Sequence, residues 1–151
     1  MRPLLRPSLL FSILALVLTA FTQAVLAADT SFHASLIWGT DEMKPDKKDL
    51  RELDAKTKEK LKSIFKWKNY FEVDSQDFKI STNEFRKLKM SSKCEVEVHN
   101  LGKDGMEIKL FGEGKLVKKI KQQTPILESL VLAGDDINSS AWFVILAPIT
   151  K

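Results

Sequence analysis

From residue 67 onward the chain is built of short segments in which apolar and polar residues alternate, or in which aromatic and β-branched residues gather. These segments are 67–73, 77–81, 85–90, 93–99, 105–112, 115–121, 127–133 and 141–147. Turn-forming residues separate them at spacings of roughly 8–12 residues. The pattern predicts an antiparallel sheet of about 7–8 strands that curls into a sandwich or an open barrel. It leaves open whether 77–81 and 85–90 are two strands or one bent strand.

The faces of several segments can be assigned from the alternation, because successive side chains of a strand point to opposite sides. In 31–38, one face would carry Phe32, Ala34, Leu36 and Trp38. Two half-buried strands are predicted with inward residues Cys94, Val96, Val98 and Met106, Ile108, Leu110. The segment 141–147 is apolar on both faces, so we expect it to be a central, covered strand.

One helix is predicted, from about Lys47 to about Phe65, with Asp46 as its N-terminal cap. Apolar residues recur at helical spacing on one side, while lysines alternate with acids around the rest. The predicted stripe is Leu50, Leu53, Leu61, Ile64 and Phe65. Together with the strands this gives an α+β, mostly β fold, in which one amphipathic helix packs on the sheet.

The first residues have the form of a signal peptide. Arg2 and Arg6 precede an uncharged apolar stretch at 9–21, and small residues favour cleavage after Ala27. Residues 1–27 would then be the signal peptide and 28–151 a single β-rich domain. The alternative is an uncleaved anchor, because the whole uncharged stretch from Pro7 to Ala28 is nearly long enough to span a bilayer, which takes ~20 residues. Cleavage implies a secreted or periplasmic protein with no membrane attachment.

Charge and cysteine content exclude some classes of function. The formal net charge is +4, which is too small for a dedicated nucleic-acid binder. A mild excess of lysine within 76–121 could face an anionic envelope polymer. Cys94 is the single cysteine, so no internal disulfide can form, and we expect its thiol to be buried.

No catalytic or metal-binding set is predicted. Cys94 and His99 would point to opposite faces of one strand, and nothing pairs His33 with His99. A strained nucleophile turn and a phosphate-binding loop are both absent from the sequence, where "FGEG" fits a tight hairpin better. The sequence predicts neither a cofactor nor a metal.

The acidic segment 135–140 is best explained as a hairpin loop. Asp136, Asn138 and Ser140 have the spacing that begins a calcium loop, but the glycine and the final glutamate of that motif are missing. A looser calcium site at this loop stays open. Glycosylation of Asn138 stays open too, because it depends on a eukaryotic secretory host.

The aromatic residues supply the candidate ligand site. Trp38 and Trp142 lie on apolar strands and are expected in the core. Trp67 and Tyr70 stand among lysines beside the predicted helix end and are expected to be partly exposed, so Trp67, Tyr70 and Lys68 are the predicted ligand-binding residues.

The sequence therefore favours a small exported, non-enzymatic protein, a binding or structural module of the cell envelope or extracellular space. Its expected partner is an envelope polymer or another exported protein. Two alternatives remain: a small carboxylate-dependent hydrolase acting on envelope polymer, and a protein inhibitor or assembly partner that uses the last strand as an edge.

Overall fold

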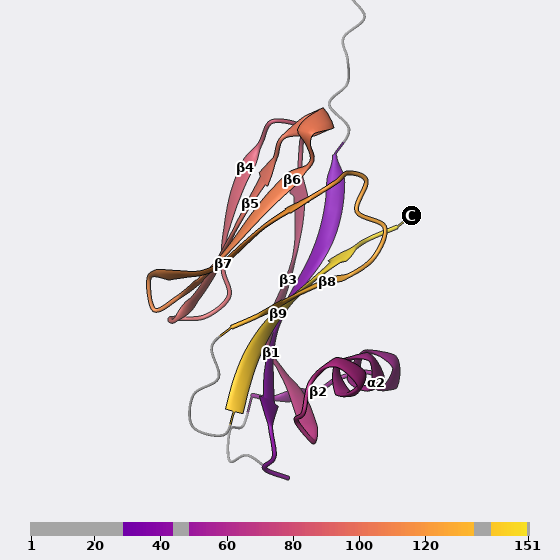
Figure 1. Cartoon of the computed structure of the whole chain (residues 1–151), viewed down its shortest axis with the longest axis vertical. Helices are drawn as coiled ribbons and strands as arrows, with labels where there is room; N and C mark the ends of the chain where they lie inside the picture. The colour runs from indigo at the N-terminus through magenta and orange to yellow at the C-terminus, as the bar shows by residue number, and fades with distance from the viewer. Residues whose placement is uncertain (1–28, 44–48, 135–139, 151) are drawn as a thin grey trace, which may run out of the picture.

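The computed structural model describes residues 29–43, 49–134 and 140–150, which form a mostly β structure with two antiparallel sheets and one α-helix (Figure 1). The expected α+β sandwich is confirmed. The elements in chain order are β1 Thr30–Thr40, β2 Arg51–Glu52, α2 Ala55–Ile64, β3 Asn69–Ile80, β4 Phe85–Lys89, β5 Cys94–Asn100, the 3-10 helix η1 Gly102–Asp104, β6 Met106–Gly112, β7 Lys115–Gln122, β8 Leu130–Ala133 and β9 Ser140–Pro148.

The five-stranded sheet has the order β2-β3-β1-β9-β8, and the four-stranded sheet has the order β4-β5-β6-β7. The four-stranded sheet is a meander of consecutive strands joined by short turns. Its β6–β7 turn consists of Glu113 and Gly114, both at positive φ (49° and 77°), the backbone geometry of a tight two-residue hairpin. The predicted hairpin at "FGEG" is thus confirmed.

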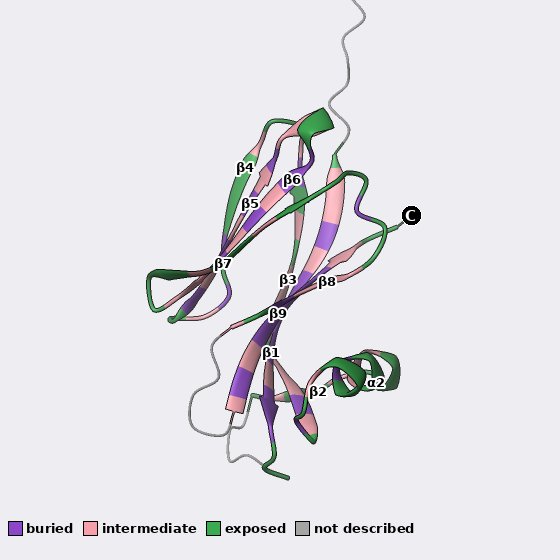
Figure 2. Ribbon diagram, viewed as in Figure 1, coloured by how far each residue is buried: buried purple, intermediate pink, exposed green. Residues whose placement is uncertain are grey.

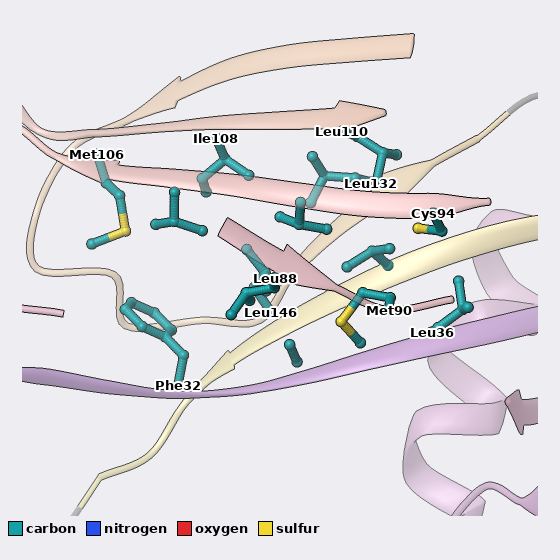
Figure 3. Packing of buried hydrophobic residues seen from close by; sticks show 14 of the residues in the cluster. Phe32, Leu36, Leu88, Met90, Cys94, Met106, Ile108, Leu110, Leu132 and Leu146 are labelled. Carbon is teal, nitrogen blue, oxygen red and sulfur yellow. The ribbon is translucent and has the colours of Figure 1, made fainter. Parts of the chain in front are cut away.

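Apolar residues from both sheets meet in a core between them (Figure 3). The predicted inward residues of β5 and β6 are all buried there, together with Phe32, Ala34 and Leu36 of β1. These positions are filled because strict alternation leaves each strand with one apolar face, and the two apolar faces stabilise each other when they are removed from water. Cys94 lies in this core, as expected.

A second apolar cluster lies on the opposite face of the five-stranded sheet, where α2 covers it. Leu61 of the helix packs with Ile37, Phe143 and Ile145. β9 therefore contributes side chains to both clusters, which confirms that it needs cover on both faces. It pairs with β1 along its length and with β8 over 143–146, so the last strand is not a free edge. The expectation that it could serve as an edge for a partner is wrong in this respect.

The helix is shorter than predicted and begins at Ala55. Asp54 caps it, because its side chain accepts a hydrogen bond from the Thr57 amide at 2.9 Å. Residues 49–54 are not helical, and within them β2 pairs with β3. The helix ends at Ile64, which is 56% exposed, and the chain is extended at Phe65. The predicted cap Asp46 and first residue Lys47 lie outside the described residues.

The predicted segments 67–73 and 77–81 form one long strand, β3, instead of two. The pairing of β1 with β3 shifts between Leu36 and Ile37, so that Val73 has no partner on β1. This β-bulge absorbs the break in alternation that suggested a turn at 74–76. The segments 77–81 and 85–90 are separate strands of different sheets, because the chain turns at Asn83, whose φ is 63°.

The predicted signal peptide lies outside the described residues. No helix within the described ranges is long and apolar enough to cross a membrane.

Candidate functional site: a groove with an aromatic row

Three aromatic side chains lie side by side on neighbouring strands of the five-stranded sheet. Trp38 of β1 is directly opposite Trp142 of β9, and on its other side it is opposite Phe71 of β3. Directly opposed residues of an antiparallel pair share a face of the sheet. Strands lie about 4.8 Å apart, so these rings form an apolar strip roughly 10 Å across. We call Phe71, Trp38 and Trp142 the aromatic row.

The aromatic row is half-buried. All three residues have intermediate exposure, and the rings of Trp38 and Phe71 are 6.3 Å apart between centroids at an angle of 39°. Val73, the bulged residue of β3, is 37% exposed nearby. The expectation that Trp38 and Trp142 are core residues is therefore wrong in part. They lie at the margin of the inter-sheet core and keep apolar surface that water or a ligand can reach.

A groove of about 560 Å³ lies over this part of the sheet. Its apolar lining comes from β1, β3, β7 and β9, and its polar lining comes from the turns of the four-stranded sheet and the start of β9. The residues are Leu36, Ile37, Trp38, Val73, Ser91, Lys93, Cys94, Gly112, Glu113, Val117, Ser140, Ala141 and Trp142. This volume is within the range of roughly 300–1,000 Å³ that is typical of small-molecule sites.

The wall opposite the aromatic row is held by contacts between two hairpin turns. The Glu113 amide donates a hydrogen bond to the Lys93 carbonyl oxygen at 2.7 Å. The Lys93 Nζ and Glu113 Oε1 atoms also form an ion pair at 3.0 Å. The two turns are thereby tied together, which fixes one charged pair at the margin of the groove.

Two glycines make room for Trp142. A Cβ atom built on Gly134 would lie 2.0 Å from Cε2 of the indole, and one built on Gly112 would lie 2.9 Å from its Cζ2. Any larger residue at Gly134 would push the indole away, because real Cβ contacts are not that short. The position of Trp142 in the groove therefore depends on these glycines.

The predicted ligand-binding residues are not part of this groove. Trp67 is 5% exposed and Tyr70 is 1% exposed, so the expectation that they are partly exposed is wrong. Both belong to the cluster under α2, where burial raises the pKa of the Tyr70 phenol. Of the three, Lys68 alone is exposed, and its amide donates to Asp41 Oδ1 at 3.2 Å. The side chain of Trp67 points inward although Lys66 and Lys68 on either side of it are exposed. The lysines in the sequence therefore led to the wrong prediction of its exposure.

A second, smaller hollow of about 160 Å³ lies between α2 and the outer face of the five-stranded sheet. His33, Ser35 and Glu72 are among its polar lining residues. The His33 Nδ1 atom pairs with Asp77 of β3, and Glu72 accepts a hydrogen bond from the Ser75 hydroxyl at 3.1 Å. Within the described part of the chain, no hydrogen bond joins Ser35 to His33, so the serine and histidine do not form an activated pair there.

Asp54 and Glu72 are the carboxylates of this hollow, and Asp54 is engaged in capping α2. Hydrogen bonds from Thr57 are the largest cause of a lowered pKa of Asp54. A glycosidase pair needs one carboxylic acid that stays protonated, which requires a raised pKa. Asp54 has the opposite shift and is unsuited to that role.

Cys94, His33 and His99 are not gathered into a set of metal-ligating side chains within the described ranges. In the ranges 29–43, 49–134 and 140–150, three or more metal-ligating side chains gather nowhere. Burial raises the pKa of the Cys94 thiol to about 12, which removes its reactivity as a thiolate near neutral pH. Asp135, Asp136 and Asn138 lie outside the described residues, and the calcium and glycosylation predictions with them.

No protein-family model, curated protein or solved structure matches this chain.

Proposed function

We propose that this chain is a non-enzymatic binding module of the cell envelope or extracellular space, and that it holds an envelope polymer in the groove over the aromatic row. One observation carries the proposal: Trp38 and Trp142 lie side by side and line a groove of about 560 Å³, and Phe71 packs against Trp38 on the next strand.

Sugar rings suit such a surface. The C–H groups of one face of a sugar ring pack on an indole, while the hydroxyl groups at its edge need hydrogen-bonding partners. Ser91, Ser140, Lys93 and Glu113 supply polar groups at the margin of the groove. A row across three strands is long enough to contact more than one point on a chain of rings, which favours a polymer over a single small molecule.

The test is equilibrium binding to soluble oligosaccharides from glucans, chitin and cell-wall glycan, neutral and acidic, by isothermal titration. Trp38→Ala should weaken binding about fivefold or more, taking for a sugar ring the ~1–3 kcal/mol that stacking of a nucleobase on an aromatic side chain contributes. Trp38→Phe keeps an aromatic surface and should restore most of the affinity. Circular dichroism melting would show that both variants remain folded.

Phe85→Ala is the matched control. Phe85 is an aromatic residue that solvent reaches, as Trp38 is in part, but it lies on β4 opposite His99, on the outer face of the other sheet. Its replacement should leave the affinity unchanged. Equal affinity of the parent and Trp38→Ala for every oligosaccharide, or hydrolysis of one of them by the parent, would overturn the proposal.

A further inference from the structure

We infer that the polymer held in the groove is an acidic polysaccharide, whose carboxylate or phosphate groups contact Lys115 and Lys118 of β7. This inference rests on the proposed function and adds the chemical class of the ligand. It comes from the unbalanced charge of the strand that borders the groove.

β7 is the edge strand of the four-stranded sheet and carries Lys115, Lys118, Lys119 and Lys121 within eight residues. Figure 2 shows that most of the strand is exposed. Of these lysines, Lys119 pairs with Glu107 at 2.9 Å. Lys121 is paired in register with Glu107 and lies on the outer face of the sheet. Lys115 and Lys118 form no ion pair with any residue in the described ranges, so these two positive charges have no acidic partner there.

The carboxylate nearest to β7 in the adjoining strand does not balance this charge. Glu107 already contacts both Lys109 and Lys119, at 3.2 and 2.9 Å. These two lysines lower the pKa of Glu107 and keep it ionised. One carboxylate is therefore shared by two cations, and no acidic side chain is present in β7 itself.

Two of the unpaired lysines lie beside the groove. Val117 of β7 lines the groove, and Lys118 is paired in register with the buried Leu110, which places it on the inner face of the four-stranded sheet. Lys115 is paired in register with Gly112, which lines the groove beside Trp142. A chain of rings resting on the aromatic row would therefore meet lysines where it passes the β6–β7 hairpin.

Lysines on an edge strand also hinder pairing with other strands, and this role alone would account for their presence. The position of the groove separates the two explanations. Protection of the edge requires no neighbouring ligand surface, whereas here the basic strand borders an aromatic groove. Positive charge beside a stacking surface is complementary to a ligand that carries both rings and anions.

The experiment compares three polymers that share one backbone: dextran, carboxymethyl dextran and phosphorylated dextran. Both acidic polymers should bind the full chain at least about tenfold more tightly than dextran. Their binding should weaken as salt rises from 50 to 500 mM, because exposed charges are screened. Preference for one acidic form would identify the group that the site accepts.

The test variant is the double replacement Lys115→Gln and Lys118→Gln, and the matched control is Lys56→Gln with Lys62→Gln on α2. Both remove two positive charges from the chain. An exposed charge contact contributes about 1.4- to fivefold in affinity, so the test variant should lose roughly two- to twenty-five-fold on the acidic dextrans. The control should retain the parental affinity for these polymers.

Equal binding of dextran and its acidic forms would overturn this inference and leave the proposed function standing. If neither dextran nor its two acidic forms bind, the inference is also overturned. The proposed function is then decided separately, by binding of the oligosaccharides from glucans, chitin and cell-wall glycan. Polyglutamate that binds as tightly as the acidic dextrans, unaffected by Trp38→Ala, would show a partner without rings and contradict both.

Discussion

Replacement of Trp67 by alanine should destabilise the protein strongly, because the indole is inside the cluster under α2. A tryptophan that is 5% exposed removes about 200 Å² of largely apolar surface from water. At ~25 cal/mol per Å² this burial contributes about 5 kcal/mol, and measured costs for such replacements are ~3–5 kcal/mol. That is a large share of the ~5–15 kcal/mol by which a domain is stable.

The space around Trp67 is tightly filled. A Cβ atom on Gly39 would lie 2.8 Å from Cδ1 of the indole, so the ring rests directly on that backbone. Lys66 Nζ lies over the indole, 4.6 Å from the ring centroid. This cation adds only about 0.5–1 kcal/mol at an exposed site. Lys66→Ala should therefore have a small effect compared with the loss of the indole.

Urea unfolding followed by far-ultraviolet circular dichroism measures the effect without relying on tryptophan emission. Trp67→Ala should lower the free energy of unfolding by about 3–5 kcal/mol. Lys68→Ala, at the exposed neighbour, should change it by less than about 0.5 kcal/mol. A loss below about 1 kcal/mol for Trp67→Ala would refute the assignment of Trp67 to the core, and would return it to consideration as a ligand contact.

Three further predictions concern the helix cap, the cysteine and the glycine under Trp142. Asp54→Ala should lower the free energy of unfolding by about 1 kcal/mol at pH 7. Because folding lowers the pKa of Asp54 below 3.8, the carboxylate should contribute its full stabilisation above that pH and lose it as the pH falls through the pKa of the folded state. Urea unfolding of the parent and the variant at pH 7 and pH 2.5 would show this loss. Cys94, with its pKa raised to about 12, should react with a thiol reagent at pH 8 far more slowly in the folded protein than in 8 M urea, and equal rates would disprove its burial. Gly134→Ala should displace Trp142, shift its fluorescence and cost ~1–3 kcal/mol. Gly114→Ala is the control, because a Cβ atom built on Gly114 would meet no other atom within 4 Å. It should leave the fluorescence unchanged and lower the free energy of unfolding by about 1 kcal/mol, through the positive φ of this residue alone.

The sandwich could be predicted from the sequence because its inner strands alternate strictly. Cys94, Val96 and Val98 point inward because each polar neighbour between them favours water. The two-sided apolar segment 141–147 likewise predicted a central strand, and β9 lies between β1 and β8. In both cases the pattern within one strand was enough to determine its environment.

The helix boundary and the bulge depend on interactions that no local pattern contains. The stripe from Leu50 to Phe65 fits a helix, but pairing of β2 with β3 draws Arg51 and Glu52 into the sheet and delays the helix to Ala55. Val73 disturbs the alternation of β3 without ending the strand, because β1 continues to pair on both sides of it. Tertiary pairing decided each case over local propensity.

The aromatic row was missed because it is a property of register. Trp38, Phe71 and Trp142 are far apart in sequence and become neighbours only when β3, β1 and β9 are paired. The sequence offered one signal, a tryptophan on each of two apolar strands, and that signal equally fits a core. The prediction for Trp67 was wrong because it relied on the charged residues next to it in sequence. In the fold its ring packs on Gly39, a contact that those neighbours do not indicate.

The central claim is that the groove over the aromatic row holds the ligand, and the three tryptophans of the chain allow a direct test. Nitrogen-15 heteronuclear spectra resolve one indole N–H signal for each, assigned with Trp38→Phe and Trp142→Phe. On titration with carboxymethyl dextran oligosaccharides, the signals of Trp38 and Trp142 should shift in a saturable way, while that of buried Trp67 stays in place. A shift of the Trp67 signal alone, or saturable binding with all three signals unmoved, would contradict the account.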